Sequence, residues 1–155
     1  MWKVAKIVAV VLAGLVLIQL VPYGRSHDNP PVTAEPVWSS PQIRALAQRA
    51  CFDCHSNETV WPWYSQIAPI SWGVQRDVDD GRWTMNFSEW TALAAPKADG
   101  SKLGVGQWMG TVVQKGAMPP AQYLLFHPNA DLSLAERAQL AQGFAVMFDA
   151  APKLP

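Results

Sequence analysis

Cysteine, histidine and charge are all scarce in this sequence of 155 residues. It contains two cysteines and three histidines, and 12 basic and 12 acidic residues give a formal net charge of zero. Composition therefore gives no reason to expect a nucleic acid or a strongly acidic partner. No segment alternates as a strand would, and the length after the first segment suits one modest core. We expect a single all-α domain with long irregular loops.

An apolar run dominates the N-terminus. Lys3 and Lys6 precede uninterrupted apolar residues from Ile7 to Ile18, as in a signal sequence. A cleaved signal peptide is the alternative to a retained anchor, but no convincing small-x-small cleavage site follows, which favours retention. We predict a transmembrane signal anchor over residues 1–22. The positive charges before the span predict that the rest of the chain lies outside the cytoplasm.

Proline and polar residues fill the next stretch of the chain. Residues 26–36 include three prolines and have no periodic apolar pattern. Residues 23–38 therefore read as a tether between the membrane and the domain. His27 lies in this tether, where we expect it to be solvated and not a ligand.

Helical periodicity recurs through residues 39–150, the predicted domain. Its first helix begins at Pro41 with Ser39 or Ser40 as N-cap, and its apolar stripe leads onto the two cysteines. A second helix is expected over 69–81, and a short third helix between Ser88 and Pro96. A fourth is expected over 101–115, with Gly116 as its C-cap. The last begins at Ser133, with Glu136 completing a capping box. Three glycines in the 101–115 helix cost about 1 kcal/mol each relative to alanine. They indicate close packing against a flat surface or another helix.

The segment Cys51-Phe52-Asp53-Cys54-His55 contains the candidate cofactor-binding residues. Cys-x-x-Cys-His is the spacing of c-type haem attachment. On a helix, residues three and four apart share a face, so Cys51, Cys54 and His55 can point the same way. The two thiols can add to the two haem vinyl groups, and the histidine can reach the iron. We predict haem c as the cofactor, with His55 as the proximal iron ligand.

Three other interpretations of the two cysteines are open. A redox dithiol usually lies in an alternating strand and helix pattern, which this chain lacks. A zinc site could combine Cys51 and Cys54 with two of His27, His55 and His127, although their spacing is unusual for zinc. A disulfide between Cys51 and Cys54 could instead staple a structural module.

Met118 is the candidate sixth ligand of the iron. Methionine opposite histidine is the ligand pair of electron-transfer cytochromes. Met118 follows a helix end and precedes Pro119-Pro120, which restrict the loop that would hold its sulfur. Met85, Met109 and His127 are the rivals for this position.

Tryptophan is unusually abundant, with eight in the chain. Six lie between the cysteines and Met118, which suits a domain that wraps a large flat apolar ligand, but equally suits an aromatic core. Tyr64 and these tryptophans could line the haem pocket or hydrogen-bond the propionates. Arg82 could pair with a propionate or lie on the surface. The six tryptophans are Trp61, Trp63, Trp72, Trp83, Trp90 and Trp108.

Several short motifs, taken in order, resemble the bacterial haem-binding domain family, which is cytochrome c-like. They are the run from Cys51 to Thr59, Trp63-Tyr64, Ala68-Pro69, Ser71-Trp72, Gly81-Arg82, the run from Asn86 to Trp90, and Met118-Pro119-Pro120. The similarity extends from about Ile43 to Phe148. It implies one covalently held haem with His55 as ligand, and the methionine loop agrees with Met118 as the sixth ligand.

These observations predict a membrane-anchored c-type cytochrome that passes single electrons between redox partner proteins and is not itself an enzyme. We expect it in the bacterial cytoplasmic membrane, with a single span and its C-terminal domain in the periplasm or outside the cell. The alternative is a haem sensor or haem enzyme whose sixth position is vacant or displaceable. With one attachment motif, the chain alone cannot be a two-haem peroxidase.

Overall fold

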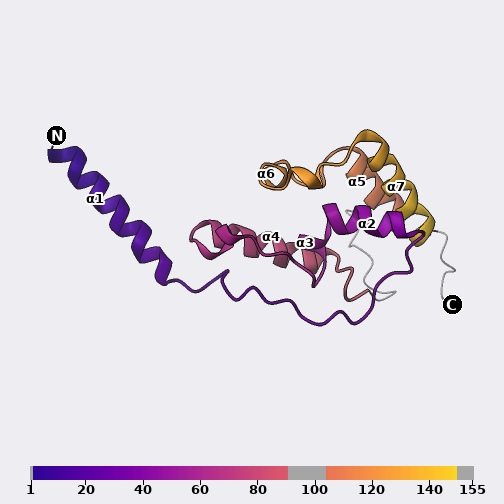
Figure 1. Ribbon diagram of the computed structural model, residues 1–155, viewed down its shortest axis with the longest axis horizontal. Helices are drawn as coiled ribbons and strands as arrows, with labels where there is room; N and C mark the ends of the chain where they lie inside the picture. Colours follow the sequence, from indigo (N-terminus) through magenta and orange to yellow (C-terminus); the bar gives the residue numbers. More distant parts are fainter. Residues whose placement is uncertain (1, 91–103, 150–155) are drawn as a thin grey trace.

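The computed structural model describes residues 2–90 and 104–149, and these residues form helices and loops (Figure 1). Within these two ranges there is no strand, only an isolated bridge between Ala34 and Glu89. The expected all-α fold is therefore confirmed. The elements in chain order are α1 (Trp2–Leu17), η1 (Ile18–Leu20), α2 (Pro41–Ala50), α3 (Phe52–His55), η2 (Trp63–Gln66), α4 (Ile70–Thr84), α5 (Val105–Gln114), α6 (Ala121–Leu124), η3 (Pro128–Ala130) and α7 (Leu134–Asp149).

The N-terminal helix is apolar and stands apart from the other helices (Figure 1). Together α1 and η1 form a 19-residue helical segment, Trp2–Leu20, that is long and apolar enough to cross a membrane, and none of it is buried. At 1.5 Å per residue it spans about 28 Å, close to the hydrocarbon thickness of a bilayer. The chain thus has the single N-terminal helix that the sequence predicts.

Local signals placed α2 correctly. The hydroxyl of Ser40 accepts a hydrogen bond from the amide of Ile43 at 3.2 Å, and Pro41 is the first helical residue. The apolar stripe of α2 is buried, and Cys51, with φ of −129°, separates α2 from α3. The motif therefore begins a new short helix and does not continue α2, which is a difference from the expected single run.

Two glycines allow α5 to pack directly against α7. A Cβ on Gly106 would collide with the carbonyl oxygen of Phe144, and one on Gly110 would lie 3.0 Å from the Cβ of Ala141. The inference that the glycines mark close packing against another helix is confirmed for Gly106 and Gly110, whereas Gly104 is the N-cap of α5 and lies outside the helix. Leu140 and Phe144 of α7 are buried in the same core.

The ends of α5 and α7 follow their sequence signals. Lys115 caps α5, and Gly116 follows with φ of +70°, a conformation that favours glycine. The amide of Ser133 donates to Glu136, whose own amide donates to the Ser133 hydroxyl, so the capping box is confirmed. The helix predicted over 69–81 is α4, which extends three residues further. Most of the helix predicted after Ser88 lies outside the described residues, as do residues 101–103.

Residues 26–36, which we call the strap, run along the domain in place of a free tether. The His27 ring stacks on Trp61 at 4.6 Å and lies within hydrogen-bond distance of Ser65 and Gln66. Further along, the amide of Thr33 donates to the carbonyl of Ser88. The expectation that His27 is solvated was wrong, because the aromatic partner comes from a distant loop that local composition does not reveal.

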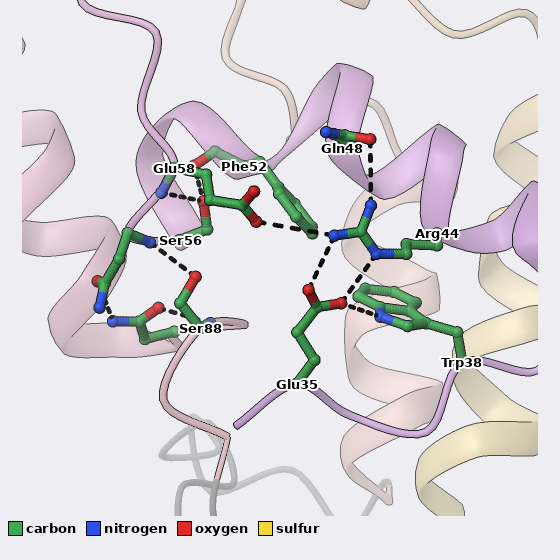
Figure 2. A network of polar contacts seen from close by, with 10 residues as sticks. Glu35, Trp38, Arg44, Gln48, Phe52, Ser56, Glu58 and Ser88 are labelled. Carbon is green, nitrogen blue, oxygen red and sulfur yellow. Dashed lines mark hydrogen bonds and ion pairs between the residues drawn. The ribbon is translucent and has the colours of Figure 1, made fainter. Parts of the chain in front are cut away.

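The strap ends in a polar network around Arg44 of α2 (Figure 2). The Arg44 guanidinium donates to both carboxylate oxygens of Glu35, at 2.8 and 2.9 Å, and Trp38 donates to the same carboxylate at 2.8 Å. Glu58, just beyond the Cys-x-x-Cys-His motif, lies 3.8 Å from Arg44. One arginine thus joins the strap, α2 and the loop after α3.

This network predicts that Glu35→Gln loses stability in a pH-dependent manner. The hydrogen bonds from Arg44 lower the pKa of Glu35 below its ordinary value of 4.5. The carboxylate therefore stabilises the fold above pH 4.5, and this contribution is lost as the pH falls through the lowered pKa. At pH 7 we expect Glu35→Gln to be less stable by about 1 kcal/mol, as for a partly exposed bidentate pair. Thermal unfolding in detergent micelles, followed by circular dichroism, measures the difference.

Gln48→Ala is the matched control, because Gln48 accepts from the same guanidinium at 3.3 Å without carrying a charge. Gln48→Ala should lower the free energy of unfolding by the same amount at pH 7 and pH 3. The difference in the free energy of unfolding between wild type and Glu35→Gln should instead shrink as the pH falls from 7 to 3. An unchanged gap would show that the Glu35 charge does not contribute.

Candidate functional site

The two cysteines and the adjacent histidine line a cavity of about 300 Å³. Cys51, Cys54 and His55 contribute one part of its lining, and the C-terminal half of α4 lies beside them. The remaining lining comes from Ala50 of α2, Met85 after α4, α5, the loop at Met118, Tyr123 of α6 and Phe144 of α7. The volume is at the lower end of the range for ligand pockets, and most side chains around it are apolar. The structure thus brings the motif to an apolar cavity between helices.

His55 is fixed in one orientation by the end of α4. Its Nδ1 atom lies 3.0 Å from the carbonyl oxygen of Gly81 and 3.2 Å from that of Met85. A carbonyl only accepts, so Nδ1 carries the proton and Nε2 keeps its lone pair for a metal. Burial lowers the pKa of His55, which favours the neutral ring that a metal requires. The chemistry of this donor fits haem iron.

Gly81 also sets how closely α4 approaches the motif. A Cβ at this position would collide with the carbonyl oxygen of Cys54 and lie 2.9 Å from the Cβ of Cys54. Only a glycine lets the backbone of α4 lie directly on α3. The same residue therefore provides both the contact and the carbonyl that orients His55.

The two thiols are half-buried, and the pKa of each is raised. Burial raises the pKa of Cys51 and of Cys54 to about 12, and the charge of Asp77 adds to the effect on Cys54. A redox dithiol needs at least one thiol of lowered pKa, so these surroundings disfavour that interpretation. Both cysteines are free thiols in this structure, not a disulfide.

The zinc interpretation has no support in the geometry. Both cysteines and all three histidines lie within the described part of the chain, where no three potential ligands among His, Cys, Asp and Glu come together. His27 is held by the strap contacts, and the ring of His127 stacks on Tyr123 at 4.0 Å. The histidines are therefore separated by the fold.

Met118 lines the cavity from a loop held by Arg137 of α7. The Arg137 guanidinium donates to the carbonyls of Met118 at 3.2 Å and Val113 at 3.0 Å, and its Nε donates to the carbonyl of Leu132 at 2.9 Å. The Met118 residue itself is 38% exposed. Arg137 was missed by the sequence reasoning, because its role depends on contacts between segments far apart in the chain.

The rivals of Met118 divide into two groups. Met85 and Met109 line the same cavity, with Met109 almost fully buried in the core and the carbonyl of Met85 engaged by His55. His127 instead lines a second cavity of about 270 Å³, and its Nδ1 donates to the carbonyl of Tyr123 at 3.0 Å. The structure thus brings three methionines, but not His127, to the cavity of the motif.

The second cavity adjoins the first and was not anticipated from the sequence. Tyr123 lines both cavities, and its hydroxyl donates to Asp53 of the motif at 2.6 Å. Burial and this carboxylate raise the pKa of Tyr123, so the phenol stays protonated. Tyr64 lines only the second cavity. The proximity of Tyr123 to the motif gave no sequence signal, since the two lie 70 residues apart.

Most of the tryptophans do not surround the first cavity. Trp108 is the one of the six that lines it. Trp90 packs on Phe148 at 4.6 Å in the core, whereas Trp63 and Trp83 are exposed. Most of the tryptophans named above therefore lie in the core or on the surface and not around this cavity.

Arg82 is half-buried, and its guanidinium donates to protein groups of the strap and of the loop after α3. It donates to the carbonyl of Ser56 at 2.8 Å and to the hydroxyl of Thr59 at 3.0 Å, both in the loop after α3. It also donates to Asp28 and Asn29 of the strap. Hydrogen bonds from Arg82 therefore connect both the strap and the loop after α3 to α4.

The fold and the cavity define a helical domain whose motif can present two thiols and an imidazole to a flat ligand. The family model described as haem-binding domain matches residues 13–145. The chain belongs to the haem-binding domain family, and haem is its cofactor. No curated protein and no solved structure matches the chain.

Proposed function

We propose that this protein is a membrane-anchored c-type cytochrome that carries single electrons between partner proteins. Cys51 and Cys54 would hold one haem covalently, and His55 and Met118 would bind its iron. The observation that carries the proposal is the fixed ring of His55, whose Nδ1 is held by two carbonyls beside two free thiols in one apolar cavity. Orientation of a ligating histidine by backbone carbonyls is a recurring feature of metal sites.

The bound haem would supply a one-electron redox couple, and the chain would tune it. Apolar side chains such as Val112 and Val113 line the cavity and would limit the access of water to the haem. A methionine sulfur opposite histidine raises the reduction potential, and Arg137 fixes the loop that would present it. We expect a low-spin haem that does not bind small ligands readily.

The proposed location is the outer side of the bacterial cytoplasmic membrane. The apolar segment Trp2–Leu20 is long enough to span the bilayer, and Lys3 and Lys6 precede its core. Positive residues favour the cytoplasmic side, so the domain would face the periplasm. Haem attachment to thiols in bacteria takes place on that side.

One observation favours a haem sensor or haem enzyme as the alternative. Met118 is 38% exposed and sits in a loop that the described contacts hold through its backbone, so its sulfur could be displaced by a diatomic gas or peroxide. Carbon monoxide added to the reduced protein separates the two functions. Rapid and complete binding would favour the alternative, and slow or absent binding would favour the electron carrier.

Covalent attachment is tested by the mass and reduced absorption spectrum of the chain expressed with a cytochrome c maturation system. We expect the mass of the chain plus one haem, with sharp low-spin bands. The double variant Cys51→Ala, Cys54→Ala should lose the covalent haem completely, because both thioether bonds are removed. His27→Ala is the control and should keep it, since the contacts of His27 are with Trp61, Ser65 and Gln66, which do not line the cavity of the motif. A wild-type chain without haem mass would contradict the proposal.

A further inference from the structure

The end of the apolar N-terminal segment is docked onto the domain through one side chain. Gln19 Nε2 donates to the carbonyl of Ala68 at 2.8 Å, and the amide of Ala68 donates to Gln19 Oε1 at 3.0 Å. Arg25 donates to the same Gln19 oxygen at 2.8 Å. Because the amide pairs with both backbone groups of one residue, it fixes the distance between η1 and the loop before α4.

Exposed apolar side chains lie close to Ala68 in the sequence. Trp63, Ile67 and Ile70 are 77%, 43% and 52% exposed. Residues 60–75 contain no charged residue, an unusual length for a surface segment of a chain that is 15% charged. An exposed and uncharged apolar patch of this kind marks an interaction surface.

The occupant of this surface follows from its position. If Trp2–Leu20 spans the bilayer, Gln19 lies in its last turn, at the boundary between hydrocarbon and headgroups. Ala68 is one side-chain length away, so the apolar residues beside it are within reach of the headgroup region. Tryptophan is favoured there because its ring is apolar and its N–H is polar.

We propose that Trp63, Ile67 and Ile70, the membrane face of the domain, rest in the outer headgroup layer of the bilayer. The domain is then oriented on the membrane surface and does not project freely from it. This inference rests on the membrane anchoring in the proposed function. It deepens that function, because it decides which side of the domain partner proteins can approach.

Photo-crosslinking to lipid tests the membrane face. p-Benzoylphenylalanine replaces Trp63 in the full-length protein, which is reconstituted in vesicles of phosphatidylcholine and phosphatidylglycerol and irradiated. The matched control carries the same photo-reactive residue in place of Trp83, which is 74% exposed. Trp83 lies at the far end of α4, about 20 Å from Ile70 along the helix axis. Mass spectrometry should detect lipid adducts at position 63 at least fivefold more often than at position 83.

Retention of the chain in carbonate-washed vesicles keeps the two proposals distinguishable. Retention with the expected adducts supports the membrane face. If the chain is retained, three results overturn the membrane face and leave the anchor intact. They are equal lipid adducts at both positions, no lipid adducts at position 63, and cross-links to another copy of the protein. Release of the chain by carbonate overturns the membrane anchoring itself, and the membrane face with it.

The substitution Gln19→Ala provides a second test that leaves the membrane face unchanged. It removes both hydrogen bonds to Ala68, so the domain loses its fixed position above the last helical turn. We expect lipid adducts at position 63 to fall severalfold, while the chain stays in the washed vesicles. Unchanged adduct formation would show that the docking by Gln19 does not orient the domain.

Discussion

Gly81→Ala is expected to leave the chain largely without haem and to lower the stability of the domain by about 3 kcal/mol, at the upper end of the usual cost of overpacking. The added methyl group would collide with the carbonyl oxygen of Cys54, a backbone atom that cannot move aside without displacing α3. The same displacement would separate the Gly81 carbonyl from Nδ1 of His55. Haem content per chain after maturation and thermal unfolding in detergent micelles measure the two effects.

Gly73→Ala is the matched control for this prediction, because it makes the same change on the same helix. Nothing lies within 4 Å of a Cβ built at Gly73, so the methyl group causes no steric clash. Alanine is the better helix former, and we expect this variant to keep its haem and gain up to about 1 kcal/mol. If Gly81→Ala behaves like Gly73→Ala, the close approach of α4 to the motif is not required for haem binding.

Met118→Leu is expected to lower the reduction potential by about 100 mV or more, within the wide range that axial ligands set. Leucine keeps the volume of methionine but has no sulfur, so the effect of the ligand is separated from that of packing. Without the thioether, the iron should lose its low-spin spectrum and bind carbon monoxide rapidly after reduction. Redox titration and absorption spectra before and after carbon monoxide addition provide the measurements.

Met85→Leu and Met109→Leu are the controls, since both residues line the same cavity. They should keep the low-spin spectrum and shift the potential far less. Arg137→Leu should give a reduction potential between those of wild type and Met118→Leu, because Met118 is present but its loop is no longer held by the guanidinium. A wild-type spectrum in Met118→Leu, together with a changed one in either control, would assign the sixth ligand to that other methionine.

The parts of the fold that the sequence predicted are those governed by neighbouring residues. The cap of α2 at Ser40 and the capping box at Ser133 and Glu136 need only three or four residues to form, and both were found as expected. The close packing implied by the glycines of α5 was also correct, because a glycine in a helix has a cost that some contact must offset.

Long-range contacts explain what the sequence did not reveal. Arg82 joins α4 to the strap across more than 50 residues, and no local pattern distinguishes such an arginine from a solvated one. Arg137 binds a loop 19 residues away through its backbone. Every residue has a backbone carbonyl. An arginine that binds carbonyls therefore needs no particular residue type as its partner, and the sequence does not reveal which residues it contacts.

The candidate site was predictable in its residues but not in its surroundings. Spacing alone placed Cys51, Cys54 and His55 together, since all three lie within one turn and a half of chain. The carbonyls of Gly81 and Met85 that orient the imidazole could not be foreseen, because they depend on how α4 crosses α3. The sequence therefore predicts that these three side chains lie together, and the packing of α4 sets the orientation of the imidazole.

The strap limits how far the domain can travel. Sixteen free residues between 23 and 38 could extend to about 55 Å and let the domain search a large volume above the membrane. Contacts of His27, Thr33 and Glu35 with the domain remove this freedom. If the N-terminal helix anchors the protein as proposed, we therefore expect its encounters with other anchored proteins to be collisions by lateral diffusion in two dimensions, at a fixed height above the bilayer.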